Sequence, residues 1–139
     1  MGASTDVGMA KLGLGYSSYS ANKAYFIGVG TDIGSAKVNL VYLSSNAVGG
    51  TSGASANTVG VNTQIPVTEG LAARVAYYTT DGSTINGSNT VVGALYSLSA
   101  KTQLFANYEK ATGAVVVNGG NGGTETATNR TTVGVSTSF

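Results

Sequence analysis

The residue types that most often carry out chemistry are scarce in this sequence. The 139 residues include no histidine and no cysteine, so the usual proton shuttle, thiolate catalysis, disulfides and the commonest transition-metal ligands are excluded. The six Asp and Glu residues are scattered, unlike the paired carboxylates of glycosidases. Without histidine no conventional catalytic triad can form, and no motif supports the one alternative, a Ser–Lys dyad. We therefore expect no enzyme, no metal site and no cofactor.

Charged side chains recur instead within segments in which polar and apolar residues alternate, and they occupy the polar positions of these segments. Four are basic and two are acidic: Lys11, Asp32, Lys37, Arg74, Glu109 and Arg130. One interpretation is a lumen lining that sets ion preference. The other is local pairing, between Asp32 and Lys37 across a turn and between Glu109 and Arg130 on neighbouring strands; the two interpretations are compatible. Arg74 has no obvious partner, which makes it the best candidate for a cation that faces solute.

Amide side chains occupy the same polar positions. Asn39, Asn62, Gln64, Gln103 and Asn107 would complete a polar inner face, although they could equally serve only to keep that side of the strands polar. The predicted pore-lining set is Lys11, Lys37, Asn39, Asn62, Gln64, Arg74, Asn107, Glu109 and Arg130. No metal-binding set is predicted.

The elements that position these residues are strands, and the last eleven residues show why. In N-R-T-T-V-G-V-S-T-S-F, alternate positions from Thr131 to Phe139 are apolar or threonine. The positions between them, from Arg130 to Ser138, are polar or glycine. Side chains of a strand alternate between its two faces. The segment therefore predicts a strand with one apolar face that ends on an aromatic residue.

Seven earlier segments alternate in the same way. The eight expected strands are residues 9–18, 24–31, 36–44, 57–65, 71–79, 90–98, 102–110 and 129–139. Each has about the length that a tilted strand needs to cross a bilayer. Their outer faces carry Leu, Val and six tyrosines typical of interfacial girdles, although a tyrosine-rich soluble sheet would share this pattern. Their inner faces are rich in glycine.

The connections between these strands alternate in length. Those at 32–35, 66–70 and 99–101 are short, whereas those at 45–56, 80–89 and 111–128 are long and rich in Gly, Ser, Thr and Asn; the connection at 19–23 is brief. Membrane barrels have short periplasmic turns and longer outer loops. The pattern places the C-terminus on the short-turn side.

Composition agrees with a membrane barrel. Charged residues make up only 9% of the chain, against roughly 25% in ordinary soluble domains. No run approaches the ~18 apolar residues of a membrane helix. The net charge of +1 gives no strong field for nucleic acid.

The segments M-A-K-L-G-L-G-Y, V-G-A-L-Y-S-L-S-A-K-T-Q-L-F-A-N-Y and T-V-G-V-S-T-S-F resemble the general bacterial porins of Gram-negative outer membranes. The resemblance covers nearly the whole chain. It implies an all-β, antiparallel up-and-down transmembrane β-barrel with eight strands in this chain, a single domain over residues 1–139. It also implies a location in the bacterial outer membrane, contact with its lipid, trimeric assembly, and recognition of the carboxy-terminal Phe139 by the barrel-assembly machinery.

The start of the chain carries no signal-peptide pattern, and residues 2–8 read as the end of one more strand and a turn. We therefore expect a mature or trimmed chain that corresponds to the carboxy-terminal half of a porin of about 16 strands. The constriction loop of the family belongs to the other half, and no candidate for it is present. The implied function is passive diffusion of ions and small hydrophilic solutes.

A structural role is the alternative: an outer-membrane barrel or sheet that anchors, adheres or assembles without conducting. Closure would discriminate between the two, because eight closed strands leave room only for side chains. The glycine-rich inner face favours a wall of a larger or multi-chain pore. In either case, the first and last expected strands, 9–18 and 129–139, should both be hydrogen-bonded, to each other or to another chain, because lipid cannot satisfy bare edges.

Overall fold

The computed structural model describes residues 1–19, 22–48, 51–83, 86–116, 124–126 and 129–137. The described residues are all-β. The strands are β1 (Gly2–Val7), β2 (Ala10–Tyr19), β3 (Asn22–Ile33), β4 (Ala36–Val48), β5 (Thr51–Thr68), β6 (Leu71–Gly82), β7 (Gly87–Ser97), β8 (Thr102–Val116), β9 (Thr124–Thr126) and β10 (Asn129–Thr137). Within those ranges no helix is long and apolar enough to span a membrane.

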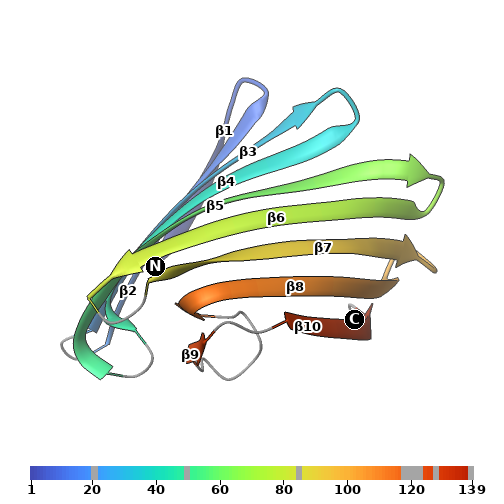
Figure 1. Cartoon of the computed structure of the whole chain (residues 1–139). Helices are drawn as coiled ribbons and strands as arrows, with labels where there is room; N and C mark the ends of the chain where they lie inside the picture. Colours follow the sequence, from blue (N-terminus) through green and yellow to red (C-terminus); the bar gives the residue numbers. More distant parts are fainter. Residues whose placement is uncertain (20–21, 49–50, 84–85, 117–123, 127–128, 138–139) are drawn as a thin grey trace.

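Nine strands follow one another in a single up-and-down path of antiparallel pairs. The order is β1-β2-β3-β4-β5-β6-β7-β8-β10, and the short β9 pairs with β8 outside this path. The sheet twists and curls, as Figure 1 shows. Among the described residues, β1 pairs only with β2 and β10 pairs only with β8. The sheet is therefore open. The first expected strand, β2, is paired on both sides, by β1 and β3. The last expected strand, β10, pairs only with β8 among the described residues, so its expected second partner is not found within this chain.

The strand count corrects the expectation of eight. The additional strand of the path is β1, where the sequence indicated the end of one more strand. Its hairpin with β2 is formed by six residue pairs from Gly2↔Gly15 to Val7↔Ala10. The other expected strands are all present. Thr137 pairs with Thr102 at the start of β8, so β10 runs toward the short-turn side, as predicted.

Tight turns close the hairpins on that side. Gly8 and Gly34 both adopt φ of +62° between paired strands, a left-handed conformation that costs glycine little because it has no Cβ. In β5, Pro66 lies beyond the last pair with β4, which is Lys37↔Gln64. Its missing N–H therefore breaks no bond to that strand, and a register shift follows between Pro66 and Thr68.

The opposite ends of the strands extend much further than the sequence predicted. The expected loop at 45–56 is mostly strand, because the β4–β5 hairpin continues through Ala47↔Ser52 and Val48↔Thr51 after a register shift. Strand β5 alone has 18 residues, and β8 has 15. The Gly- and Ser-rich segments therefore lengthen the hairpins on this side rather than only connecting them.

The sheet has two different faces. The inner face is the one that carries Lys11, Lys37 and Arg74; the outer face carries Leu12, Leu40 and Val75. All the buried side chains of the described residues lie on the inner face: Ala56, Ala72, Ala76, Thr80, Asn89 and Ala111. Large apolar side chains of the outer face, among them Leu40, Val75 and Val135, are exposed. Large apolar side chains are thus exposed on this face, against the usual arrangement, although Leu12 and Val61 of the same face are half-buried.

Candidate solute-facing surface

All nine residues predicted to line a pore occupy the inner face, in two neighbouring rows across the sheet. Directly opposed residues of antiparallel strands share a face. One row contains Lys11, Asn39, Asn62, Glu109 and Arg130; the other contains Lys37, Gln64, Arg74 and Asn107. The rows run from β2 to β10 and do not converge on one point. The nine residues therefore form two polar rows on one face of the sheet, and their role in lining a pore stays a prediction.

Basic side chains are spaced along these rows. Lys11 lies on β2, Lys37 on β4, Arg74 on β6 and Arg130 on β10, so the first three occupy alternate strands. In the described part of the chain, Arg74 has neither a hydrogen bond nor an ion pair, and its neighbours Ala72 and Ala76 are too small to cover it. It is half-buried. That Arg74 faces solute stays a prediction.

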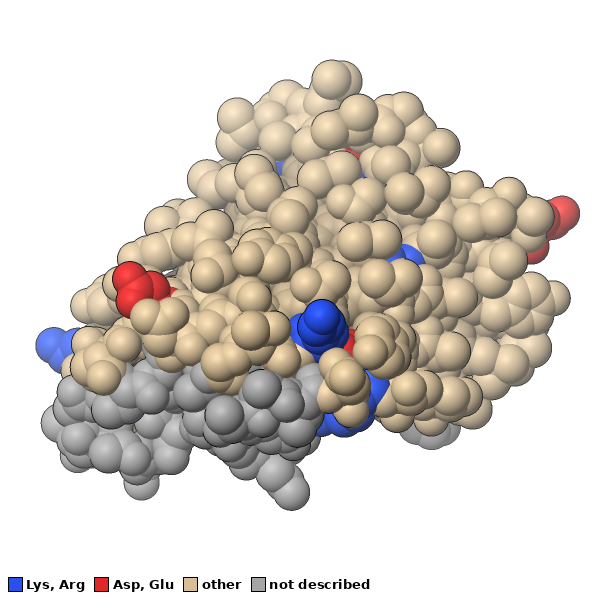
Figure 2. Space-filling view, in the orientation of Figure 1, with Lys and Arg blue, Asp and Glu red and all other residues tan. Residues whose placement is uncertain are grey.

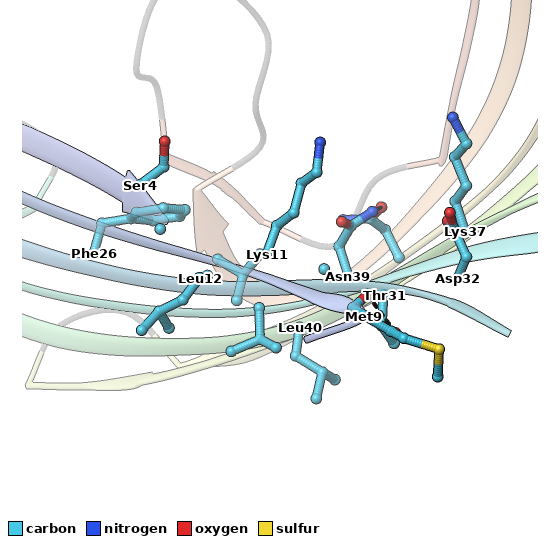
Figure 3. A pocket seen from close by; sticks show the side chains of 16 residues that line it. Ser4, Met9, Lys11, Leu12, Phe26, Thr31, Asp32, Lys37, Asn39 and Leu40 are labelled. Carbon is cyan, nitrogen blue, oxygen red and sulfur yellow. Dashed lines mark hydrogen bonds between the residues drawn. The ribbon is translucent and has the colours of Figure 1, made fainter. Parts of the chain in front are cut away.

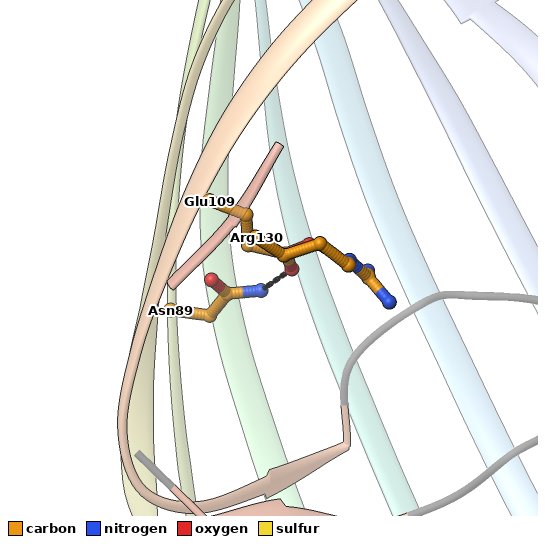
Figure 4. Close-up of polar contacts among 3 residues, drawn as sticks. All are labelled: Asn89, Glu109 and Arg130. Atoms are coloured by element: carbon orange, nitrogen blue, oxygen red, sulfur yellow. Dashed lines mark hydrogen bonds and ion pairs between the residues drawn. The ribbon is translucent and has the colours of Figure 1, made fainter. Parts of the chain in front are cut away.

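The strongest polar contact of this face joins Glu109 and Arg130, as predicted. Arg130 Nη2 donates to Glu109 Oε2 at 2.6 Å and Nε donates to the same oxygen at 3.2 Å. Asn89 Nδ2, from β7, donates to Glu109 Oε1, and Figure 4 shows this amide directed at the carboxylate. Three successive strands are therefore joined by one network, with Asn89 buried.

The predicted pairing of Asp32 with Lys37 is wrong at the level of side-chain contact. The two residues face each other across the β3–β4 hairpin. No ion pair joins their side chains. The ion pair found among the residues that the structure describes is the one between Arg130 and Glu109. Lys37 and Asp32 are both exposed. Water competes for both charges there, so holding two flexible side chains together gains little.

Amide contacts follow the same rows. Asn39 Nδ2 donates to Asn62 Oδ1 at 3.0 Å, linking β4 to β5. In the other row, Asn107 lies two strands from Arg74. The Oδ1 atoms of Asn107 and Asn89 are both buried and have no hydrogen-bond partner among the described residues. The predicted role of these amides as a polar lining fits their positions, and solute contact stays a prediction.

Several glycines of the inner face are covered by neighbouring side chains. The ring of Tyr78 lies so close over Gly60 that a Cβ there would be 2.1 Å from its Cδ1. Phe105 covers Gly134 and Phe26 covers Gly28 in the same way, with 2.6 and 2.9 Å to the ring Cζ. Aromatic rings therefore occupy part of the space that the glycines leave.

Sequence reasoning missed these aromatic residues, although the signal was present. Phe26, Tyr78 and Phe105 each directly follow an outer-face residue, Tyr25, Tyr77 or Leu104, so alternation assigns them to the inner face. Apolar side chains such as Val41, Val91 and Leu95 share it. The inner face thus combines polar rows, aromatic rings that cover glycines, and aliphatic side chains.

On the outer face, the six predicted tyrosines are all exposed, by 37% to 51%. Four of these tyrosines lie six residues from the turn-side end of their strand: Tyr16 from Ala10, Tyr42 from Ala36, Tyr77 from Leu71 and Tyr108 from Thr102. They therefore form a band at one level, which Tyr25 joins through a tilted contact with Tyr16, with 5.1 Å between ring centroids and 40° between ring planes. Tyr96 lies near the turns instead.

Charge is almost absent from the face in view in Figure 2, over β6 to β8, where only a few scattered groups interrupt uncharged side chains.

The predicted assembly signal, Phe139, lies outside the described residues, and its environment stays a prediction.

Comparison with known proteins identifies a fold but not a family. No protein-family profile matches the sequence, and no curated protein matches it significantly. One similar solved structure is OmpT, an outer membrane protein of Vibrio cholerae, folded in vitro and in its trimer form. The TM-score is 0.58 at 16% identity, over 96% of this chain and 52% of that chain. The chain spans about half the length of that protein and has the fold of an outer-membrane β-barrel wall.

Proposed function

We propose that this chain forms part of the wall of a porin-like pore in the bacterial outer membrane, through which ions and small hydrophilic solutes diffuse passively. The observation that carries the proposal is the assignment of the two faces. Charged and amide side chains occupy two rows on the inner face, whereas the outer face is apolar and exposed. A water-filled lumen on one side and lipid on the other would solvate both faces.

The outer face supports the lipid contact. Its tyrosine band lies at one level, with exposed apolar residues such as Ile33 and Leu98 near the turns. Six residues of a strand rise about 20 Å, or roughly 15 Å along the membrane normal at a tilt of about 40°. This is shorter than the apolar band of ~25 Å typical of such barrels, and exposed apolar residues around the turns, such as Leu98 and Val67, extend it.

The open edges of β1 and β10 require partners in a bilayer, because lipid offers no hydrogen bonds to the backbone. We propose that further strands complete the wall, that the completed barrels associate as homo-oligomers, and that Phe139 is read by the barrel-assembly machinery. Trimeric association follows the resemblance to general porins.

The proposed role involves no bond chemistry and no cofactor. The chain has no histidine or cysteine. Its polar side chains are distributed over many strands, which suits continuous solvation of a passing solute better than one reacting centre.

Reconstitution in a planar lipid bilayer tests the proposal. The protein, refolded in detergent and added to the bilayer, should produce stepwise, ohmic conductance that scales with electrolyte conductivity. A folded, inserted protein without conductance would overturn the diffusion role and favour the alternative of a structural wall. Unfolded protein at the same concentration serves as the control for leakage, and native mass measurement in detergent gives the number of chains per pore.

A further inference from the structure

A hollow of about 530 Å³ lies over the inner face of β2 to β5. Its lining includes Lys11, Phe26, Lys37, Asn39 and Asn62. In Figure 3 the ammonium ends of both lysines point to the same side of the sheet as the ring of Phe26, whereas Leu12, Leu40 and Met9 point to the other side. The hollow therefore combines two cations, one aromatic ring and two amides on one face.

The ring of Phe26 lies flat against the sheet, where glycines leave room for it. Cβ atoms built at Gly13, Gly15 and Gly28 would approach the Phe26 side chain at 3.8, 3.5 and 2.9 Å. Phe26 is nevertheless 40% exposed. One ring face thus packs on glycine backbone and the other is open to solvent, an arrangement that offers a stacking surface to a flat apolar group.

The charges around this ring are incompletely balanced. Lys11 and Lys37 have no ion pair among the described residues, and Asp32 lines the same hollow. Asp6 faces Lys11 from β1 without contacting it. The Asn39–Asn62 hydrogen bond uses Asn39 Nδ2 and Asn62 Oδ1, which leaves the Asn62 amide hydrogens available as donors. Ammonium and amide donors together suit a carboxylate.

We propose that this hollow is a binding subsite for small organic anions that carry a flat apolar ring, of which an aromatic carboxylate is the simplest example. The ring would stack on Phe26 while the carboxylate lies near Lys11, which is two residues along β2 from Gly13 beneath the ring. Lys37 lies farther along the face and adds attraction at longer range. This inference deepens the proposed diffusion role by naming a solute class. An inorganic anion would not use the ring, and a neutral ring would not use the lysines.

Ligand-observed saturation-transfer NMR tests the subsite on the refolded full chain in zwitterionic micelles, with protein-free micelles as the blank. Benzoate is the probe, acetate lacks the ring, and benzamide lacks the charge. Benzoate should bind more tightly than either. Phe26→Leu should weaken benzoate about three- to tenfold, the range for one aromatic contact, and leave acetate unchanged.

Matched variants separate the subsite from general effects. Lys11→Gln should weaken benzoate several-fold and Lys37→Gln should weaken it less, and both should leave benzamide unchanged. Asp32→Asn should strengthen benzoate. Phe105→Leu and Lys23→Gln, which alter a second inner-face ring and an outward lysine, should change nothing. Circular dichroism confirms that each variant folds.

Two results would overturn the subsite: equal affinity for benzoate and benzamide, or unchanged benzoate binding in Phe26→Leu. Neither measurement depends on ion flow. Conductance without benzoate selectivity would reject the subsite and keep the pore, whereas selective binding without conductance would reject the pore and keep the subsite.

Discussion

At the scale of single residues, Arg74 is the inner-face cation with the clearest consequence. It has no hydrogen bond or ion pair in the described chain and lies between the small side chains of Ala72 and Ala76, and we expect its charge to face the lumen. Arg74→Glu should move the reversal potential toward cations in a salt gradient across the assembled pore. The shift should be modest and should shrink as salt rises, because screening extends over about 8–10 Å at ordinary ionic strength.

Arg74→Lys is the matched control, since it keeps the charge and should keep the reversal potential. An Arg74→Glu pore with the selectivity of the unmodified protein would show that another group controls ion preference.

The contact between Gly60 and Tyr78 gives a second residue-scale prediction. Gly60→Ala would place a Cβ within 2.1 Å of Tyr78 Cδ1 and 3.1 Å of Cγ, near the fixed root of the ring, so the ring must turn away. We expect a loss of about 1–3 kcal/mol in the free energy of unfolding, measured by urea unfolding in lipid vesicles with circular dichroism.

Gly13→Ala is the control for this measurement, because its new Cβ would lie 3.8 Å from the nearest Phe26 atom. The cost of Gly60→Ala should fall in a Tyr78→Ala background. An equal cost in both backgrounds would place the strain elsewhere.

Sequence alone assigned the faces of individual residues well and their contacts poorly. Period-2 alternation placed all nine polar residues on one side, since the side of a strand depends only on counting. Whether Asp32 reaches Lys37, or Tyr78 folds over Gly60, depends on rotamers and on which strand lies opposite. Neighbouring positions in the sequence do not contain that information.

At the scale of elements, the Asn89–Glu109–Arg130 network holds the edge strand. Arg130→Ala should remove the bonds between β10 and β8 at Glu109 and cost about 1 kcal/mol, because the arginine is partly solvated. The amide hydrogens of β10 should then exchange faster, and those of β3 should not.

Thr132→Ala, on the same face of β10, is the matched variant and should leave the exchange unchanged. If Arg130→Ala exchanges like the unmodified protein, the backbone ladder alone holds β10.

The turn-side ends of the strands were predictable and the opposite ends were not. Gly34 and Gly70 stop strands sharply, because their positive φ reverses the chain. On the other side, Ser, Asn and Gly residues read as loops, yet paired strands continue through Ala47 and Ser52. Cross-strand pairing overrides weak local propensity there.

At the scale of the whole molecule, the two faces should respond oppositely to charge. Val75 lies exposed on the outer face of β6, so Val75→Arg should destabilise the protein in vesicles by about 2–4 kcal/mol if this position meets the bilayer midplane. Asn62→Arg, on the inner face, should cost much less. Unfolding in vesicles measures both, and equal costs would contradict the lipid-facing assignment.

The up-and-down path has an arithmetical consequence for closure. Direction alternates at every step of a nine-strand path, so β1 and β10 point the same way. A ring with only antiparallel neighbours therefore needs an odd number of strands inserted between these edges. Self-closure would create one parallel seam, and two copies inserted in the same orientation would create two. Parity thus restricts which partners can complete this wall.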